Sequence, residues 1–230
     1  MLQENYEVVK ENIKKACQRV GRREDEVTLI AVSKTKPLSD IEEVMETGCV
    51  DFGENKVQEL CDKEEKIKRP VKWHLIGHLQ TNKVKYIVDK VALIHSVDSV
   101  KLAECISKEA VKKQVSVPVL VQVNIADEDT KFGLSKAETE EVLRKIASLP
   151  GIKVKGLMTI APFVDDPEEN RIHFKNMYQL FVDMKEKRID NVDMETLSMG
   201  MTGDYQVAVE EGATMVRVGT GIFGARNYNK

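Results

Sequence analysis

Apolar residues recur at alternating spacings of four and three along the start of the chain. They are Leu2, Tyr6, Val9, Ile13, Ala16 and Val20. This spacing places them on one face of a helix, and Gly21 is a typical residue for the end of that helix. The segment VTLIAVS (residues 27–33) follows, and its nearly continuous apolar character is typical of a parallel strand covered on both faces. The pattern predicts a leading helix and then a buried strand.

A strand followed by a helix then recurs along the chain. The further predicted strands are VDFGEN (50–55), KWHLIGH (72–78), ALIHSVD (92–98), VPVLVQVNI (117–125), VKGLMTI (154–160), ETLSM (195–199) and MVRVG (215–219). A helical pattern follows every strand except the last. Strands that alternate with helices indicate a parallel sheet, and eight such units in 230 residues favour a closed TIM (β/α)8 barrel over an open sheet. We expect one α/β domain over residues 1–230, with the first helix added in front of the barrel.

Composition and charge narrow the possible partners. Lys and Arg (35) nearly balance Asp and Glu (38), so the net charge of -3 gives no reason to expect nucleic acid or an anionic membrane as a partner. We expect no membrane span and no signal peptide, because apolar runs are short and the first residues are rich in Lys, Glu and Gln. The four cysteines share no CxxC spacing and are predicted to be reduced thiols. We expect a cytoplasmic protein that is a monomer or a weak dimer.

In a parallel barrel, functional groups lie at the carboxyl ends of the strands. Lys34 directly follows the apolar run of the first strand, so it is expected at the mouth of the barrel. Partial desolvation there favours a neutral amine, which can attack an aldehyde. The alternative is a lysine that marks the end of the strand and extends into water. Lys36 is the competing amine, but Pro37 follows it and we expect its side chain to point to solvent. The charge-rich residues 63–72 are interpreted as a solvated helix end.

Two glycine-containing segments come after the seventh and eighth strands. They are Ser198-Met199-Gly200-Met201 and Gly219-Thr220-Gly221. Barrels often bind phosphate with these two loops, because glycines let backbone N–H groups converge on an anion and hydroxyls add donors. Turn formation alone is the alternative explanation. Arg217 lies between Val216 and Val218, so it points to the opposite face of its strand from them; a structural ion pair inside the barrel is the alternative to a binding role.

The remaining polar residues near strand ends give weaker signals. His74 and His78 are four apart, but the intervening residues read as strand and no third ligand is apparent, so we expect no metal. Asn55 ends the second strand, where it is either a contact at the rim of the barrel or a helix cap.

These segments together resemble the YggS/PROSC family of pyridoxal 5'-phosphate (PLP) homeostasis proteins, which is related to the N-terminal barrel of alanine racemase. The matching segments are AVSKTKP (31–37), FGEN (52–55), WHLIGHLQ.NK (73–83), VQVNI...KFG (121–133), GLM.I (156–160), LSMGM..D (197–204) and VRVGT.IFG.R, which ends at Arg226. They occur in order, fall at successive strand ends and cover nearly the whole chain.

The resemblance implies a role for each candidate residue. Lys34 would carry PLP as an internal aldimine, a Schiff base. Ser198, Gly219 and Thr220 would hold the phosphate, and Arg217 would face the pyridine nitrogen. Four further residues would line the pocket or add backbone contacts: Asn55, His78, Met199 and Gly200.

The resemblance also implies a function without a robust reaction. Family members are thought to bind, store or deliver PLP, with apo PLP-dependent enzymes as possible recipients, so we expect no catalytic residues in the strict sense. A PLP-dependent amino-acid racemase is the alternative, although racemases complete their site with a second domain. A cofactor-free Schiff-base aldolase on the same barrel is a third class, and it would be colourless.

Overall fold

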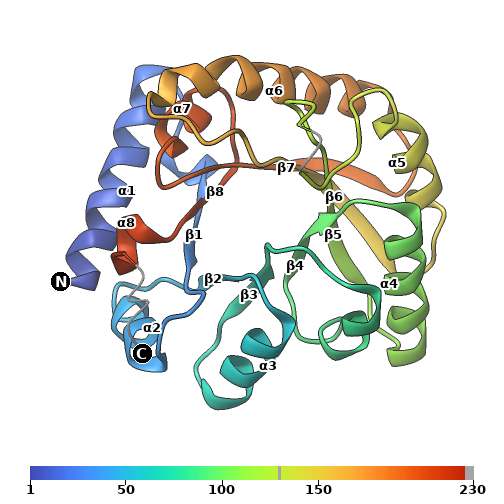
Figure 1. Cartoon of the computed structure of the whole chain (residues 1–230), viewed down its shortest axis with the longest axis horizontal. Helices are drawn as coiled ribbons and strands as arrows, with labels where there is room; N and C mark the ends of the chain where they lie inside the picture. The colour runs from blue at the N-terminus through green and yellow to red at the C-terminus, as the bar shows by residue number, and fades with distance from the viewer. Residues whose placement is uncertain (129–130, 226–230) are drawn as a thin grey trace.

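The computed structural model describes residues 1–128 and 131–225, and eight parallel strands form a closed barrel at its centre (Figure 1). The strands are β1 (Thr28–Val32), β2 (Asp51–Glu54), β3 (Lys72–Leu75), β4 (Leu93–Val97), β5 (Val117–Gln122), β6 (Ile152–Met158), β7 (Val192–Met201) and β8 (Met215–Val218). Each strand pairs with its sequence neighbours, and β1 closes the barrel against β8. The predicted fold class is confirmed.

Helices surround the barrel as an outer ring (Figure 1). The α-helices are α1 (Leu2–Arg19), α2 (Leu38–Met45), α3 (Val57–Lys66), α4 (Val100–Lys113), α5 (Thr139–Ala147), α6 (Arg171–Glu186), α7 (Tyr205–Glu210) and α8 (Thr220–Phe223). Short 3-10 helices are η1 (Glu24–Glu26), η2 (Thr81–Tyr86) and η3 (Pro167–Asn170). The helix expected after β3 is therefore the 3-10 helix η2, and a single helical turn, α8, follows the last strand.

Side chains on the two faces of the strands have different characters. Successive residues of a strand point to opposite faces, so Ile94 packs outward in the large apolar cluster beneath the helices while Leu93 and His95 point into the barrel. Leu93 forms a small separate apolar cluster with Leu120 and Met158. Polar side chains fill other interior positions, and all of these positions are buried. The interior of the barrel thus combines a small apolar cluster with polar groups, and these polar groups are candidates for a functional role.

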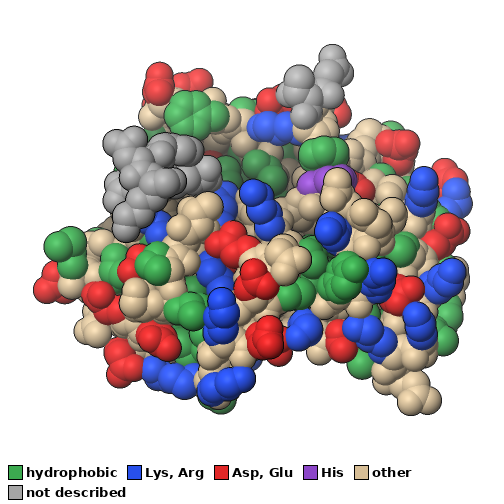
Figure 2. Space-filling model, turned by 60° about the horizontal axis from the view of Figure 1, so that its bottom comes forward, with side chains coloured by type: hydrophobic (Ala, Val, Ile, Leu, Met, Phe, Trp, Pro, Cys, Tyr) green, Lys and Arg blue, Asp and Glu red, His purple; other side chains and the backbone are tan. Residues whose placement is uncertain are grey.

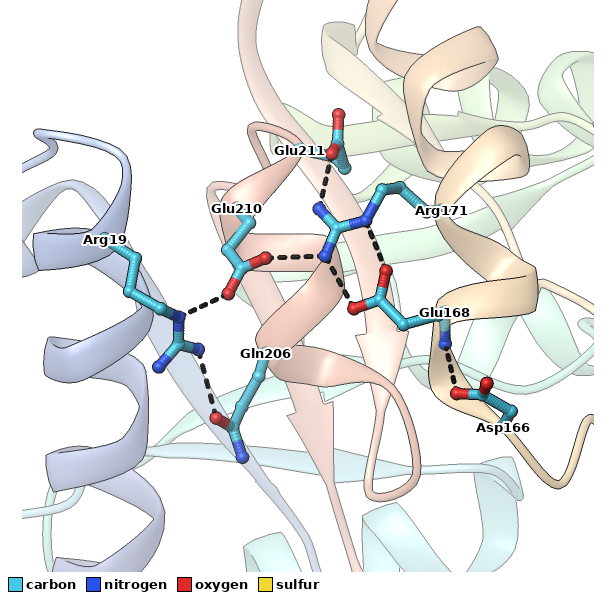
Figure 3. A network of polar contacts seen from close by, with 7 residues as sticks. All are labelled: Arg19, Asp166, Glu168, Arg171, Gln206, Glu210 and Glu211. Carbon is cyan, nitrogen blue, oxygen red and sulfur yellow. Dashed lines mark hydrogen bonds and ion pairs between the residues drawn. The ribbon is translucent and has the colours of Figure 1, made fainter.

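Helix α1, predicted as an addition to the barrel, packs beside α7 and α8. A network of ion pairs joins α1 and α7 to α6 and η3 (Figure 3). Arg19 of α1 donates to Glu210 of α7 over 2.6 Å, and Arg171 at the start of α6 contacts both Glu210 and Glu211 at 2.7 and 2.6 Å. Arg171 also pairs with Glu168 of η3. We refer to these five residues as the outer network.

Basic and acidic side chains are interspersed over the face of the molecule in Figure 2, without a broad area of one sign. This distribution agrees with the near balance of charged residues in the sequence. None of the helices within residues 1–128 and 131–225 is both long enough and apolar enough to cross a bilayer.

Candidate functional site

Lys34 lies two residues after the end of β1, at the carboxyl end of the barrel, and its side chain is half-buried. Ser33 before it is fully buried. Thr35 after it has a φ of +63°, in the left-handed region that a β-branched residue rarely adopts. A strained residue beside a candidate functional lysine persists only if surrounding contacts hold it in place.

Those contacts come from Lys63, which is buried with 6% of its surface exposed. Its Nζ donates to the carbonyl oxygen of Ser33 at 2.8 Å, to Glu54 Oε1 at 2.8 Å and to Glu59 Oε1 at 2.7 Å. Glu59 Oε1 in turn accepts the backbone N–H of Thr35 at 2.6 Å. Both residues that flank the candidate lysine are therefore held by one ion-paired cluster, which we call the Lys63 clamp. The interpretation of residues 63–72 as only a solvated helix end is wrong at Lys63.

Glu54 completes the Lys63 clamp from the end of β2. Its Oε1 also accepts the hydroxyl of Ser33 at 2.6 Å. Burial raises the pKa of Glu54, while the nearby Lys63 acts in the opposite direction. Within the described part of the chain, Glu54 Oε2 is buried and has no hydrogen-bond partner. A cluster of this kind is costly to form and therefore points to a role in shaping the site.

Lys36 does not extend into solvent, so that expectation is wrong. Its Nζ donates to the carbonyl oxygens of Phe223 at 2.7 Å and of Gly224 and Ala225 at 3.3 Å. Phe223 is the last residue of α8 and the other two residues follow it, so the ammonium group neutralises the carboxyl end of that turn. Lys36 thus ties the loop after β1 to the loop after β8.

Strand β7 is longer than predicted, and this changes the position of its polar residues. The segment 198–201 forms the end of β7 rather than a loop after it. Ser198 is fully buried, and its Oγ accepts Arg217 Nη1 at 2.6 Å and lies 2.9 Å from His95 Nδ1. Met199 is fully buried as well, and Gly200 has a φ of +92° with no room for a Cβ beside Ala208.

The first residue after β7 is Thr202, which the sequence pattern does not indicate as a candidate site residue. Its Oγ1 accepts the backbone N–H of Gly219 at 3.2 Å and that of Gly221 at 3.4 Å. Thr220, between these glycines, is exposed and begins α8. The loops after β7 and β8 therefore meet at one hydroxyl, whose oxygen accepts two backbone N–H groups and whose own proton is left to donate. We call this group the hydroxyl–glycine cradle.

Arg217 points into the barrel from β8 and is 4% exposed. Besides its contact with Ser198, its Nη2 donates to the carbonyl oxygen of Thr159 at 2.9 Å. Burial lowers the pKa of Arg217 to about 10, although the carboxylate of Asp204 acts in the opposite direction. The guanidinium therefore stays protonated at neutral pH and can only donate hydrogen bonds.

His78 and Asn55 lie at the rim, after β3 and β2. The His78 ring stacks on Phe132 with centroids 3.9 Å apart and an interplanar angle of 14°. His78 Nδ1 lies 3.4 Å from Asp98 Oδ2. The Asn55 backbone passes so close to Gly77 that a Cβ there would lie 2.4 Å from the Asn55 carbonyl oxygen. Glycine is thus required where the ends of β2 and β3 meet.

The structure thus brings several predicted residues together. Gly219 lies against Val32 of β1, because a Cβ on it would be 3.5 Å from the Val32 carbonyl oxygen. Lys34 and the cradle consequently follow adjacent strands. Arg226 lies outside the described residues. Across residues 1–128 and 131–225, no three His, Cys, Asp or Glu side chains are arranged to hold a metal ion.

Comparisons with known proteins agree with this architecture. The family model described as "Alanine racemase, N-terminal domain" matches residues 5–227. The pyridoxal phosphate homeostasis protein of Aquifex aeolicus is 45% identical over 221 residues, which are 96% of each chain. PipY of Synechococcus elongatus, solved with PLP bound, is 33% identical with a TM-score of 0.81 over 92% of this chain and 100% of that one. An unknown protein from Bifidobacterium adolescentis is 35% identical with a TM-score of 0.91 over 96% of this chain and 94% of that one.

The fold and the polar mouth of the barrel define a protein of the alanine racemase N-terminal class. Within that class, the chain belongs to the family of pyridoxal phosphate homeostasis proteins.

Proposed function

We propose that this protein binds PLP at the mouth of the barrel, attaches it to Lys34 and holds it for intracellular storage or delivery. One observation carries the proposal: Lys34 and the hydroxyl–glycine cradle follow the adjacent strands β1 and β8. A PLP-bound structure of a relative that is 33% identical supports the same ligand. We expect this function in the cytoplasm, from a monomer or a weak dimer.

The chemistry of the site fits the three polar parts of PLP. When bound, PLP supplies an aldehyde that condenses with a primary amine, on a pyridine ring that also carries a phosphate. Lys34 is the amine at the strand end, the cradle offers the Thr202 hydroxyl proton for the phosphate, and Arg217 offers a donor for the ring nitrogen. Asn55 and His78 are proposed as contacts at the rim, and Met199 and Gly200 as backbone contacts.

Thr202 joins Ser198, Gly219 and Thr220 in the proposed phosphate site. Thr202 Oγ1 already aligns two backbone N–H groups, so the cradle is organised by the chain itself. Ser198 is fully buried and its hydroxyl contacts Arg217, so we propose that it also orients the guanidinium. A contact between Ser198 and the phosphate stays a prediction.

The Lys63 clamp would hold the backbone around Lys34 in the conformation that cofactor binding requires. Ser33 and Thr35 are fixed on either side of the lysine, so its backbone needs little reordering when the cofactor arrives. Preorganisation of this kind increases affinity because less conformational entropy is lost on binding.

Arg217 favours holding the cofactor over running transamination, whereas racemization, which can proceed without a fully protonated ring, stays open as the alternative. PLP withdraws electrons best when its ring nitrogen is protonated, usually opposite a carboxylate. Arg217 stays charged and can only donate, so the ring nitrogen would stay unprotonated. The naming of the relatives agrees with a binding role. A racemase-like enzyme is the second candidate, since the family model takes its description from alanine racemase.

Transfer experiments test the proposed function. The PLP-loaded protein is mixed with an apo PLP-dependent enzyme, and recovered activity of that enzyme reports delivery. The loaded protein is also mixed with L-alanine or L-serine, with D-isomer and keto acid as the readouts. Delivery without turnover supports the proposal, whereas turnover on the order of 1 s⁻¹ or faster would favour the enzyme.

The phosphate site has its own test. Thr202→Val keeps the shape of the side chain but removes the hydroxyl, and a lost hydrogen bond to a charged group costs about 1.5–3 kcal/mol. We expect PLP affinity to fall about tenfold or more, and pyridoxal, which lacks the phosphate, to bind wild type weakly. Thr47→Val, on the loop after α2, is the matched control with unchanged affinity. Equal affinities of wild type and Thr202→Val would remove the cradle from the site.

A further inference from the structure

A chain of four polar contacts crosses the interior of the barrel. Asp51 Oδ1 lies 3.0 Å from His74 Nε2, and His74 Nδ1 lies 3.0 Å from His95 Nε2. His95 Nδ1 lies 2.9 Å from Ser198 Oγ, which accepts Arg217 Nη1 at 2.6 Å. The residues come from β2, β3, β4, β7 and β8, so the chain spans opposite walls of the barrel. We call it the interior chain.

The two ends of the interior chain fix the direction of its hydrogen bonds. Arg217 carries only donors, and an ionised Asp51 carries only acceptors. Ser198 accepts from Arg217, so its single proton is free to go to His95 Nδ1. His95 then donates from Nε2 to His74 Nδ1, and His74 donates from Nε2 to Asp51. Each of the four contacts receives one proton, and both imidazoles stay neutral.

Burial makes this arrangement hard to replace by another. His74, His95, Ser198 and Arg217 are each between 0 and 4% exposed, so water cannot substitute for a missing partner. Burial and the proximity of His74 and Arg217 all lower the pKa of His95 well below 6.5, which keeps that ring neutral. In the reverse direction, Ser198 would accept from both Arg217 and His95, and its own proton would have no acceptor in the chain. His74 Nε2 would then either lack a proton opposite a carboxylate or carry one on a charged ring.

We propose that the interior chain positions Arg217 for the ring nitrogen of the cofactor, and that Asp51, His74 and His95 are positioning residues of that site. The proposal rests on the proposed function for the identity of the ligand. Ser198 holds one arm of the guanidinium and the Thr159 carbonyl holds the other, so the remaining N–H groups keep a fixed direction.

Asp51 is the most distant member and gives the sharpest prediction. It is the first residue of β2, at the amino end of the strand, whereas Lys34 follows the carboxyl end of β1. The parallel strands place these ends on opposite faces of the barrel. Asp51 therefore cannot touch a ligand bound beside Lys34, and any effect of Asp51 on binding passes through the chain.

The first test uses the cofactor-free protein. Long-range 1H–15N correlation spectra report which imidazole nitrogen carries the proton, and His74→Gln and His95→Gln variants assign the signals. We expect both rings to be neutral and protonated at Nε2. A proton on Nδ1 of His95, or a doubly protonated His74, would overturn the proposed direction.

The second test compares variants at Asp51 by titration with PLP, followed by the absorbance of the bound cofactor. Asp51→Ala removes the acceptor, and we expect the dissociation constant to rise about three- to tenfold, in the lower part of the range for coupled members of one network. Asp51→Asn keeps an oxygen acceptor and should stay within about twofold of wild type. Asp193→Ala is the matched control, because Asp193 lies near the amino end of β7 and pairs with Lys155 outside the chain.

The outcomes separate this proposal from the proposed function. Unchanged affinity in Asp51→Ala, or an equal loss in Asp193→Ala, overturns the positioning role. A wild-type protein that shows the expected tautomers but fails to bind PLP instead contradicts the proposed function. If Asp51→Ala does not fold, His74→Gln interrupts the chain one contact further in and should weaken PLP binding by a similar factor.

Discussion

The outer network and the interior chain are both continuous sets of polar contacts, but their physical settings differ. In the outer network, the charged Arg171 side chain is 27% exposed and meets three carboxylates, of which Glu168 is 59% exposed and Glu210 and Glu211 are 13% and 15% exposed (Figure 3). In the interior chain, His95 and Ser198 are fully buried and neutral, and each has two neighbours in the chain. The number of contacts is thus a poor guide to what each network contributes.

The difference lies in what replaces a lost partner. Water and salt screen an exposed ion pair, so most such pairs stabilise a fold by at most about 1 kcal/mol. A buried donor or acceptor that loses its partner costs about 1–3 kcal/mol, because no water can reach it. We therefore expect the interior chain to be sensitive to single substitutions and the outer network to be tolerant.

The largest effect should come from His95→Leu. This change leaves His74 Nδ1 and Ser198 Oγ each without one partner, so we expect the free energy of unfolding to fall by about 3 kcal/mol or more. Urea unfolding measures it as a shift of the midpoint. His173→Leu on α6 is the control and should change stability by less than about 0.5 kcal/mol. Equal losses in the two variants would contradict the comparison.

Lowering the pH should have the second-largest effect on the stability of the protein, through the interior chain. The pKa of His95 is well below 6.5 in the folded protein, so the unfolded chain takes up a proton near 6.5 while the folded chain does not. Stability consequently falls as pH drops below 6.5, by about 1.4 kcal/mol for this group at pH 5.5. Urea unfolding from pH 7.5 to 5.5 checks the slope. His95→Gln should reduce the slope of the unfolding free energy against pH by an amount that corresponds to the uptake of up to one proton. An unchanged slope would mean that another group is responsible.

Arg171→Met should have a smaller effect on stability. The substitution removes the centre of the outer network, and we expect a loss of about 1 kcal/mol, because Arg171 itself is partly buried. The loss should shrink when unfolding is measured in 0.5 M rather than 0.05 M salt, since screening weakens exposed pairs. A loss as large as that of His95→Leu would show that the surface contacts are energetically equivalent to the buried ones.

Arg19→Ala should have the smallest effect. Arg19 is half exposed, and among the described residues its side chain contacts Glu210 and Gln206. We expect a change within about 0.5 kcal/mol, measured by the same urea titration. A change above 1 kcal/mol would mean that this end of α1 anchors the barrel more firmly than its exposure suggests.

The same contrast explains what the sequence could predict. Alternating strands and helices are local patterns, and they were sufficient to predict the eight-stranded barrel and the position of Lys34 after β1. The sequence pattern predicts an end of β7 that is too early, because residues 198–201 resemble a glycine-containing loop. Thr202, the hydroxyl that receives the Gly219 and Gly221 N–H groups, was consequently missed.

Contacts between residues far apart in the sequence were the second feature that local patterns could not predict. Lys63 lies in a charge-rich stretch, and only the fold shows that Ser33 and Glu54 bury it. The spacing of His74 and His78 suggests a pair of metal ligands only weakly, since no third ligand is apparent in the sequence. The partners of His74 are instead Asp51 and His95, which lie on the neighbouring strands β2 and β4. The side-chain alternation of these strands could have suggested the pairing only once the barrel register was known.

One measurement tests the central proposal most directly, namely that Lys34 holds the cofactor. The protein loaded with PLP is reduced with borohydride, digested and mapped by mass spectrometry. We expect a single pyridoxyl group on the peptide that contains Lys34, located on that residue by fragmentation, and none in a Lys34→Arg variant. Lys36 is the internal control, since its amine is engaged by the carbonyls of Phe223 to Ala225. A pyridoxyl group on Lys36, or on no lysine of the barrel mouth, would contradict the account.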